Sequence, residues 1–424
     1  MKRSEVFFYG WVIVAATVVW MAYQSTMFTY GMTAFITPIA VTSGWSYSQI
    51  SLASSVRGLE IGALDPLAGM LVDRYPLRWL MIGGSVIIAI GVIVISQSPP
   101  SLGIFFLGFL IAGLGTSFCQ NIVPQTVLAR WFHKNIGKAA GFLSVGFALG
   151  GLFVPLLTRG IDSIGWQPML LYLALGSVAL GIPVALIFRD RPEKYGMYPD
   201  GLIQDTDSKA TIASQGLTAR QAIRTRAFWI IGVAAMFQFV AVNAVTIYTI
   251  PYLSEDLGME RSTASIAVLI ISMIGFVVRF LYGVMADIFP KKFVYAFSNA
   301  ATTMGLLVLS NVGNAYAIMV VFGVVYGLGV SGSTAMRTPI VREYFGANHF
   351  GSVYGALSVF TVIGGTIGAP LAGWVFDTTG SFFPIWYIYA GLTTLGTLAL
   401  LILPRTALRA GEIPWQGKLI KKGT

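Results

Sequence analysis

The chain has 424 residues, of which 56% are hydrophobic and only 10% are charged, and it carries a net charge of +10 at neutral pH. With a mean hydropathy of +0.76 it cannot cover itself with polar surface. These values exclude an ordinary soluble globular protein and make lipid part of its solvent. Long apolar runs such as residues 79–96 predict membrane-spanning helices rather than the short alternating strands of a barrel.

The apolar runs predict twelve spans, six on each side of one long polar segment. Their expected ranges are 7–37, 48–72, 79–97, 101–128, 139–158, 168–188, 227–253, 263–285, 293–310, 315–336, 352–376 and 383–403. We therefore expect an N-terminal six-helix bundle over 1–188, a cytoplasmic central loop over 189–226, and a C-terminal six-helix bundle with a cytoplasmic tail over 227–424. Within the loop, residues 204–215 predict a flexible linker, and Thr218 predicts the cap of a short helix over 219–225.

Positive charge is distributed unevenly between the two sides of the predicted membrane protein. When the loops are assigned alternately to the two sides, all but four of the 27 lysines and arginines fall on the side of the N-terminus. Two of the four, Arg159 and Arg261, fall on the opposite side, and Arg57 and Arg279 lie inside spans. This bias predicts that both termini and the central loop lie in the cytoplasm, and it argues against a nucleic-acid-binding surface. The expected location is the inner (plasma) membrane.

The second half of the chain repeats the first at an offset that is the same for several motifs. Residues 69–76 (GMLVDRYP) match 283–290 (GVMADIFP), residues 113–115 match 327–329, and residues 141–145 match 355–359. The repeat predicts an all-α membrane fold of two pseudo-symmetric six-helix bundles. In such a carrier a solute binds between the halves near the membrane midplane, and rocking of the halves opens the site to each side in turn.

Four charges lie inside the predicted spans, where a charge is costly unless it has a partner or a function. Arg57, Glu60 and Asp65 are in span two, and Arg279 is in span eight. Arg279 has apolar neighbours and no acidic residue within one turn of its own helix. Its planar fork of donors suits a carboxylate, so the sequence predicts that Arg279 binds a small carboxylate.

One loop motif resembles the signature of the major facilitator superfamily, with Pro76 in place of its second glycine. The resemblance implies the major facilitator fold and a cytoplasmic latch in which Asp and Arg join helix ends. The motif lies after span two, and a second copy lies after span eight. The latch residues are Gly69, Asp73, Arg74 and Arg78, together with Gly283 and Asp287 in the second copy.

Further motifs resemble the monocarboxylate transporters. Residues 9–11 (YGW) are similar to their entry motif, residues 130–141 (RWFHKNIGKAAG) to a loop that they share with oxalate/formate exchangers, and residues 189–196 and 224–229 to their bacterial branch. The resemblance implies a proton-coupled symporter of L-lactate, pyruvate or similar monocarboxylates, with Arg279 at the place of the substrate-binding arginine. Exchange of organic anions, as in oxalate/formate exchangers, is the alternative.

The chain also departs from the animal monocarboxylate transporters. It has no lysine in span one, and Gly275 stands where they have an aspartate. Proton coupling is then expected from Glu60, Asp65 or the carboxylate of the substrate, or it is absent. Asp65 is the repeat equivalent of Arg279, so the two can form an ion pair that opens during transport. Arg57 and Glu60, three residues apart, form either a satisfied local pair or part of a proton relay or gate.

Polar residues in spans one, four, seven and ten are expected to line the cavity, because these spans line it in the superfamily. For each of them singly, a hydrogen bond between helices is at least as good an interpretation. An enzyme is disfavoured, since the two histidines lie in loops and no phosphate-binding loop is present. We expect a monomer that uses a proton gradient and no bound cofactor or metal. The cavity candidates are Tyr30, Asn121, Asn243, Tyr326 and Ser331.

Overall fold

The computed structural model describes residues 8–98, 101–201, 216–313 and 315–404, and within these ranges the chain is helical and has no strand. In chain order its helices, including π- and 3₁₀-helical segments labelled η, are α1 (Gly10–Ser25), η1 (Thr26–Tyr30), α2 (Met32–Ser43), α3 (Tyr47–Arg74), α4 (Leu77–Ser96), α5 (Leu102–Thr116), η2 (Ser117–Ile122), α6 (Val123–Trp131), α7 (Ile136–Leu149), η3 (Gly150–Phe153), α8 (Val154–Ile164), α9 (Trp166–Ile187), η4 (Pro192–Tyr195), η5 (Pro199–Gly201), α11 (Ala219–Ile223), α12 (Arg226–Pro251), η6 (Tyr252–Asp256), α13 (Arg261–Ile288), α14 (Lys291–Ser310), α15 (Tyr316–Phe345), α16 (Phe350–Thr379) and α17 (Phe383–Leu401).

Eleven helical runs in the described residues are long and apolar enough to cross a membrane. The twelfth span is α3, whose 28 residues provide the length. It falls outside the apolar set because it contains Arg57, Glu60 and Asp65. The chain is therefore a multi-pass membrane protein, and its one polar span contains three of the four charges that the sequence places in the membrane.

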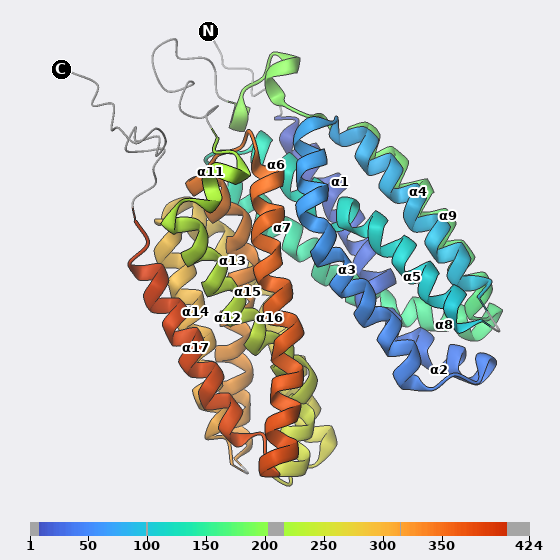
Figure 1. The fold of residues 1–424 in the computed structure, drawn as a ribbon, viewed down its shortest axis with the longest axis vertical. Coiled ribbons are helices and arrows are strands. Elements are labelled where there is room, and N and C mark those ends of the chain that lie inside the picture. The colour runs from blue at the N-terminus through green and yellow to red at the C-terminus, as the bar shows by residue number, and fades with distance from the viewer. Residues whose placement is uncertain (1–7, 99–100, 202–215, 314, 405–424) are drawn as a thin grey trace. The chain divides into compact units, whose positions relative to one another are not determined.

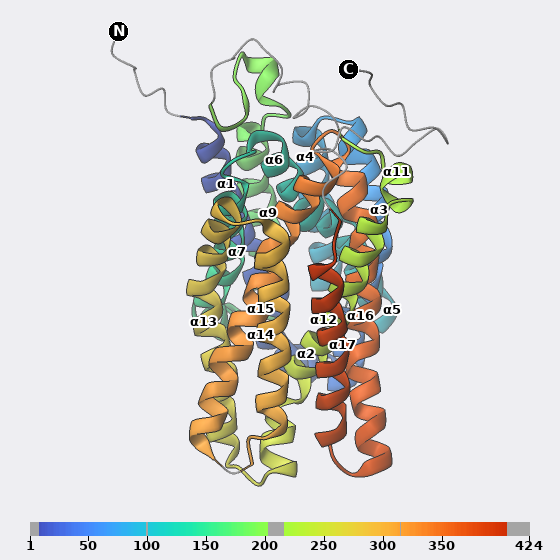
Figure 2. The same cartoon turned by 90° about the vertical axis from the view of Figure 1, so that its left-hand side faces the viewer.

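The chain forms two compact units, Met1–Ala210 and Thr211–Thr424, here called the N-terminal and the C-terminal unit. In the N-terminal unit α4 packs against α5 and α9, α1 against α7, and α3 against α5 (Figure 1). In the C-terminal unit the equivalent pairs pack, namely α14 against α15 and α17, α12 against α16, and α13 against α15 (Figure 2). The equivalence confirms the two pseudo-symmetric six-helix bundles, while the domain boundaries at residues 188 and 226 stay a prediction.

Glycines allow the helices within each unit to approach closely. A Cβ added at Gly364 would collide with the backbone oxygen of Met236, and one at Gly368 with that of Val240, both in α12. In the N-terminal unit the equivalent Gly150 lies against α1, where an added Cβ would collide with the hydroxyl of Ser25. Small residues at helix crossings therefore take the same place in both bundles.

Two π-helical segments interrupt the first and fourth spans of the N-terminal unit. The segment η1 follows α1, and η2 lies between α5 and α6. In η1, the Thr26 hydroxyl donates to the carbonyl oxygens of Ala22 at 2.7 Å and Gly150 at 3.0 Å, which joins the segment to span five. π-helical turns are frequent at functional sites, and these two flank the middle of α3.

Residues that follow span six pack on the N-terminal unit. The indole nitrogen of Trp131 donates to the Arg189 carbonyl oxygen at 2.8 Å, and Asp190 accepts from the Leu77 amide at 2.7 Å. The Asp200 carboxylate accepts from the His133 amide at 2.8 Å and from the amides of the two following residues. The first part of the central segment is thus an ordered cap on this unit.

The last part of the central segment packs on the C-terminal unit. The Leu217 amide donates to the Phe345 carbonyl oxygen at 2.9 Å. Thr218 caps α11, because its hydroxyl accepts from the Gln221 amide at 3.3 Å and the Gln221 side chain accepts from the Thr218 amide. The predicted capped helix is confirmed, whereas the predicted linker over 204–215 lies outside the described residues.

Candidate functional site

Arg279 lies on α13, inside the C-terminal unit's second long helix, and is half-buried. About 13 Å of helix separates it from Ile288, where α13 ends. One turn earlier, a Cβ added at Gly275 would lie 2.9 Å from the hydroxyl oxygen of Ser331 on α15. Residues four apart share a helix face, so the structure brings Ser331 to the stretch of α13 that carries Arg279.

Two further cavity candidates of the C-terminal unit lie in different surroundings. Tyr326 is 2% exposed in the apolar core, its backbone against Gly305 and its ring 5.5 Å from Phe322. Its hydroxyl has no hydrogen-bond partner within the described helices. Asn243 is half-buried on α12, with its amide nitrogen 3.9 Å from the Cβ position of Gly365. Direct substrate contact by either residue stays a prediction.

Both cavity candidates of the N-terminal unit belong to its π-helical segments. Tyr30 ends η1, is half-buried, and has its ring 6.0 Å from that of Phe147 on α7. Asn121 belongs to η2, but its side chain lies outside the described part of the structure. The sequence had no signal for the π-helical turns, because they contain no proline or glycine that would mark them.

Arg57 is 8% exposed on α3 and contacts η1 and α5. Its guanidinium carbon lies 4.1 Å from the centre of the Phe28 ring, and Nη1 donates to the Thr116 hydroxyl over 3.4 Å. Among the described residues it forms no ion pair with Glu60, whose Oε2 is buried without a hydrogen-bond partner. The two charges still interact electrostatically, so both interpretations, a local pair and a proton relay or gate, stay predictions.

Gly113 on α5 lies beside both Arg57 and Glu60. Gly113 has no Cβ, and the Glu60 carboxylate occupies the space that a Cβ would take. The same added Cβ would lie 2.9 Å from Cγ of Arg57. Both side chains thus pack on Gly113, but the guanidinium turns to Phe28 and Thr116 instead of the carboxylate.

Asp65 is 2% exposed on α3 and stands at the repeat position of Arg279. It belongs to the N-terminal unit and Arg279 to the C-terminal unit. The ion pair between them stays a prediction.

Asp73 forms an ion pair with an arginine from another span, while its role in a latch stays a prediction. Arg130, at the end of α6, has Nη2 3.6 Å from Asp73 Oδ1, and the two side chains are 6% and 7% exposed. The same nitrogen donates to the Val72 carbonyl oxygen at 3.0 Å. The sequence had assigned the arginine role to Arg74 and Arg78, because a motif relates neighbours along the chain and not across helices.

Arg74 and Arg78 have other contacts. The Arg74 guanidinium lies 5.9 Å from the ring of Tyr75, and Arg78 Nη2 donates to the Leu186 carbonyl oxygen on α9 at 3.0 Å. Gly69 is buried on α3. In the second copy Gly283 is buried and Asp287 is half-buried near the end of α13; a latch at Asp287 stays a prediction.

We expect Asp73→Asn to change the rate of transport and not substrate affinity. The pair of Asp73 and Arg130 joins helix ends, so its loss alters the stability of the transport conformation in which the pair is formed. The maximal uptake velocity should change by about tenfold, while the half-saturation concentration should stay within about twofold. Uptake kinetics in proteoliposomes measure both. Lys194→Ala removes an ion pair to Asp190 whose lysine is 65% exposed, and it should leave both values unchanged. A raised half-saturation concentration in Asp73→Asn alone would contradict a latch role.

Arg337 is a residue that the sequence placed in a loop. It lies within α15, which continues to Phe345, and Nη2 donates to the Ser358 hydroxyl on α16 at 3.1 Å. Its guanidinium also lies 4.9 Å from the ring centre of Tyr354. The expected span ended at residue 336, so the sequence placed both Arg337 and the buried Arg342 outside a helix that contains them.

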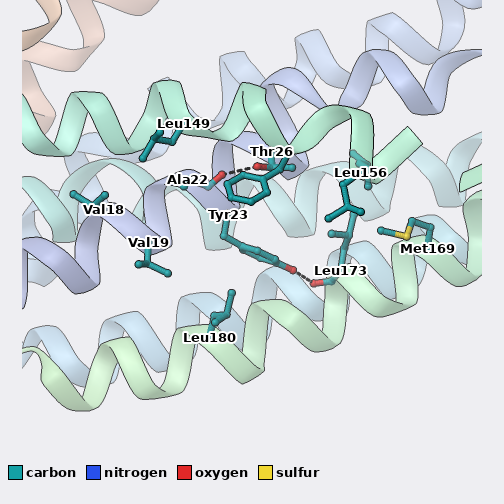
Figure 3. Close-up of a pocket in the computed structure, with 12 residues that line it drawn as sticks. Val18, Val19, Ala22, Tyr23, Thr26, Leu149, Leu156, Met169, Leu173 and Leu180 are labelled. Atoms are coloured by element: carbon teal, nitrogen blue, oxygen red, sulfur yellow. Dashed lines mark hydrogen bonds between the residues drawn. The ribbon is translucent and has the colours of Figure 1, made fainter. Parts of the chain in front are cut away.

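A cavity of about 400 Å³ in the N-terminal unit has apolar walls (Figure 3). It lies between α1, the run from α7 to α8, and α9. Its polar groups already have partners, since the Tyr23 hydroxyl donates to the Leu173 carbonyl oxygen and the Thr26 hydroxyl to that of Ala22. Without a charged group it cannot hold a carboxylate, and none of the predicted site residues lines it.

Residues 19–249 and 233–421 match the Major Facilitator Superfamily. Human monocarboxylate transporter 2 is 24% identical over 392 residues, which cover 88% of this chain and 81% of that protein. Human monocarboxylate transporter 6 is 26% identical over 402 residues, covering 87% and 77%. The crystal structure of the E. coli fucose:proton symporter FucP superimposes with a TM-score of 0.72 at 14% identity, over 94% of this chain and 98% of that one. The chain belongs to the Major Facilitator Superfamily, in which it is a secondary transporter similar to the monocarboxylate transporters.

Proposed function

We propose that this transporter carries small monocarboxylates of the L-lactate and pyruvate type together with protons, by alternating access of its two units. The observation that carries the proposal is Arg279 within the long apolar helix α13. An arginine inside a membrane span is a functional candidate by default. The similarity to proteins named monocarboxylate transporters supports the substrate class.

In this proposal Arg279 holds the substrate carboxylate. Two parallel N–H donors of one guanidinium match the two oxygens of a carboxylate, which makes the contact directional as well as charged. Ser331 lies beside the same stretch of α13 and supplies a hydroxyl for a second polar group of the substrate. The remaining candidates, Tyr30, Asn121, Asn243 and Tyr326, line the path of the solute.

Glu60 and Asp65 are the proposed proton carriers. A carboxylate that crosses with one proton moves no net charge, whereas a lone anion works against or with the membrane potential at about 2.3 kcal/mol per 100 mV. Protonation of a buried acid on α3 neutralises the charge that the substrate brings. The proposed location is the inner (plasma) membrane, with both termini in the cytoplasm and a monomer as the working unit.

Uptake of radiolabelled L-lactate by proteoliposomes tests the function. We expect an inward proton gradient to accelerate uptake and unlabelled pyruvate inside the vesicles to drive counterflow. Failure of both L-lactate and pyruvate to exchange, with intact protein in the vesicles, would refute the monocarboxylate assignment.

Exchange of organic anions is the second candidate. It is favoured by Arg57, a buried cation without an ion pair in the described part of the chain, because a dianion prefers two cationic groups. Counterflow with oxalate and formate that does not respond to a proton gradient would establish exchange in place of symport.

Replacement of the acids on α3 is expected to change the pH dependence of uptake. Glu60→Gln introduces a side chain that is neutral at every pH. If Glu60 carries the proton, a proton gradient should no longer accelerate uptake by this variant, while pyruvate counterflow should continue. Asp65→Asn is the matched variant on the same helix, and loss of acceleration in that variant instead would assign the proton to Asp65. Wild-type pH dependence and affinity in Asp65→Asn would exclude its ion pair with Arg279, and wild-type pH dependence in both variants would exclude both acids.

A further inference from the structure

Arg57 lies deep in the membrane-spanning part of the N-terminal unit. About 15 Å of helix separates it from Tyr47, the nearer end of α3. It is 8% exposed, and its neighbours Phe28 and Thr116 are neutral. A guanidinium at this depth is costly, and such residues are retained where they serve a function.

The donors of Arg57 are only partly used. Nη1 makes one long hydrogen bond to Thr116, and the face of the guanidinium covers the Phe28 ring. Nε is buried without a hydrogen-bond partner among the side chains that the structure describes. Nε and Nη2 form the side-on edge of the group, which accepts the two oxygens of a carboxylate in parallel.

The internal repeat shows that the fold does not need these charges. In the C-terminal unit Gly327 stands at the place of Gly113, and an added Cβ there would lie 3.2 Å from Ile274 and from the backbone oxygen of Ile271. Ile271 and Ile274 are the repeat equivalents of Arg57 and Glu60. The equivalents of Phe28 and Thr116 are also apolar, Val242 and Val330.

The same helix crossing is therefore built once with apolar side chains and once with an arginine and a glutamate. Apolar side chains would avoid the cost of buried charge at this place. The charged version occurs only in the N-terminal unit, between its two π-helical segments. This difference between the copies indicates a ligand rather than a packing role.

We propose that Arg57 is a carboxylate-binding residue of the N-terminal unit, which receives the anion on its Nε–Nη2 edge. Phe28 and Thr116 hold the guanidinium in place, and Glu60 balances its charge until the carboxylate arrives. The inference rests on the proposed function and assigns a carboxylate-binding residue within the N-terminal unit itself.

Thermal stability of the purified full-length protein, titrated with sodium L-lactate, measures binding separately from transport. Arg57→Lys keeps the charge but loses the fork, so the apparent Kd should rise about tenfold. Glu60→Gln removes the competing anion, so the apparent Kd should fall several-fold, by roughly the strength of a charge-assisted contact. Methyl L-lactate, which has no carboxylate, should stabilise neither the wild type nor the variants.

The double variant Arg57→Ile/Glu60→Ile introduces the pair that the C-terminal unit uses, so it should fold and should raise the apparent Kd about 10- to 100-fold. If Arg57→Lys does not fold, the double variant tests by itself whether Arg57 binds the carboxylate. Wild-type affinity in the double variant, or weaker binding in Glu60→Gln and Arg57→Lys alike, would overturn the inference and leave the proposed function standing. Absence of L-lactate binding and uptake in the wild type would overturn both.

Discussion

Uptake of L-lactate is expected to fall to the background of empty vesicles when Arg279 is replaced by alanine. The variant removes the cation from the middle of α13 and leaves the substrate carboxylate without a counter-charge in the membrane. Charge-assisted hydrogen bonds contribute about 1.5–3 kcal/mol each, so the loss of a two-bond contact should reduce apparent affinity by about 100-fold or more. Initial uptake rates over a range of substrate concentrations in proteoliposomes give this value.

A second variant at this position separates the effect of the two parallel N–H donors from the effect of the positive charge, and a variant at another arginine is the control. Arg279→Lys keeps a positive charge without two parallel donors, and it should retain weak uptake with a strongly raised half-saturation concentration. Arg220→Ala removes an exposed arginine on α11, outside the spans, and should transport as the wild type does. Uptake at the wild-type rate and affinity in Arg279→Ala would remove this residue from the substrate site.

The second large effect is expected on thermal stability, when alanine replaces Gly364 but not when it replaces the adjacent Gly365. Gly364→Ala should lower the thermal stability of the purified protein, because its Cβ would collide with the Met236 carbonyl oxygen of α12 and force α12 and α16 apart. Overpacking of a close contact costs about 1–3 kcal/mol. Backbone atoms cannot rotate away as a side chain can, so the upper part of this range is expected.

Gly365→Ala is the matched control, since its Cβ would be 3.9 Å from the amide nitrogen of Asn243, an ordinary contact. The repeat provides an independent copy of the test. Gly150→Ala should be destabilising because its Cβ would enter the space of Ser25, whereas Gly151→Ala would place its Cβ 3.8 Å from the ring of Tyr30. Equal stability of Gly364→Ala and Gly365→Ala would show that close approach at Gly364 is not needed.

The same variants bear on whether these glycines serve only static packing. If α16 must slide on α12 during transport, Gly365→Ala will keep wild-type stability but lower the uptake velocity. If the contact is static, Gly365→Ala will leave both properties unchanged.

Several features of the fold could be predicted from the sequence because they depend on the residues of a whole segment and not on contacts between segments. A run of about 20 apolar residues must cross a bilayer as a helix, whichever neighbours it has. The repeat of glycines and aspartates at one offset predicted that both halves pack in the same way, and the equivalent helix pairs confirm it. Thr218 and Gln221 predicted a helix start from local hydrogen bonding, which needs no tertiary contact.

Partners across helices were not predictable in this way. Asp73 pairs with Arg130 from the end of α6, although two arginines are closer to it along the chain. Arg57 and Glu60 share a helix face, as their spacing required, yet they form no ion pair within the described structure. The Glu60 carboxylate packs on Gly113 of α5, and the Arg57 guanidinium contacts Phe28 and Thr116. Spacing determines which side chains are near, but neighbouring helices determine what they contact.

By itself, then, the sequence determined a twelve-span membrane protein of two repeated halves, since hydrophobic length and internal repetition do not depend on how side chains meet. It also placed Arg279 and Asp65 at equivalent depths of equivalent helices. Only the tertiary structure decided that Asp73 pairs with Arg130, that Arg337 is inside α15, and that Arg57 faces Phe28 and Thr116. The physical reason is that contacts between helices depend on the side chains of both helices, which the spacing along one helix does not specify.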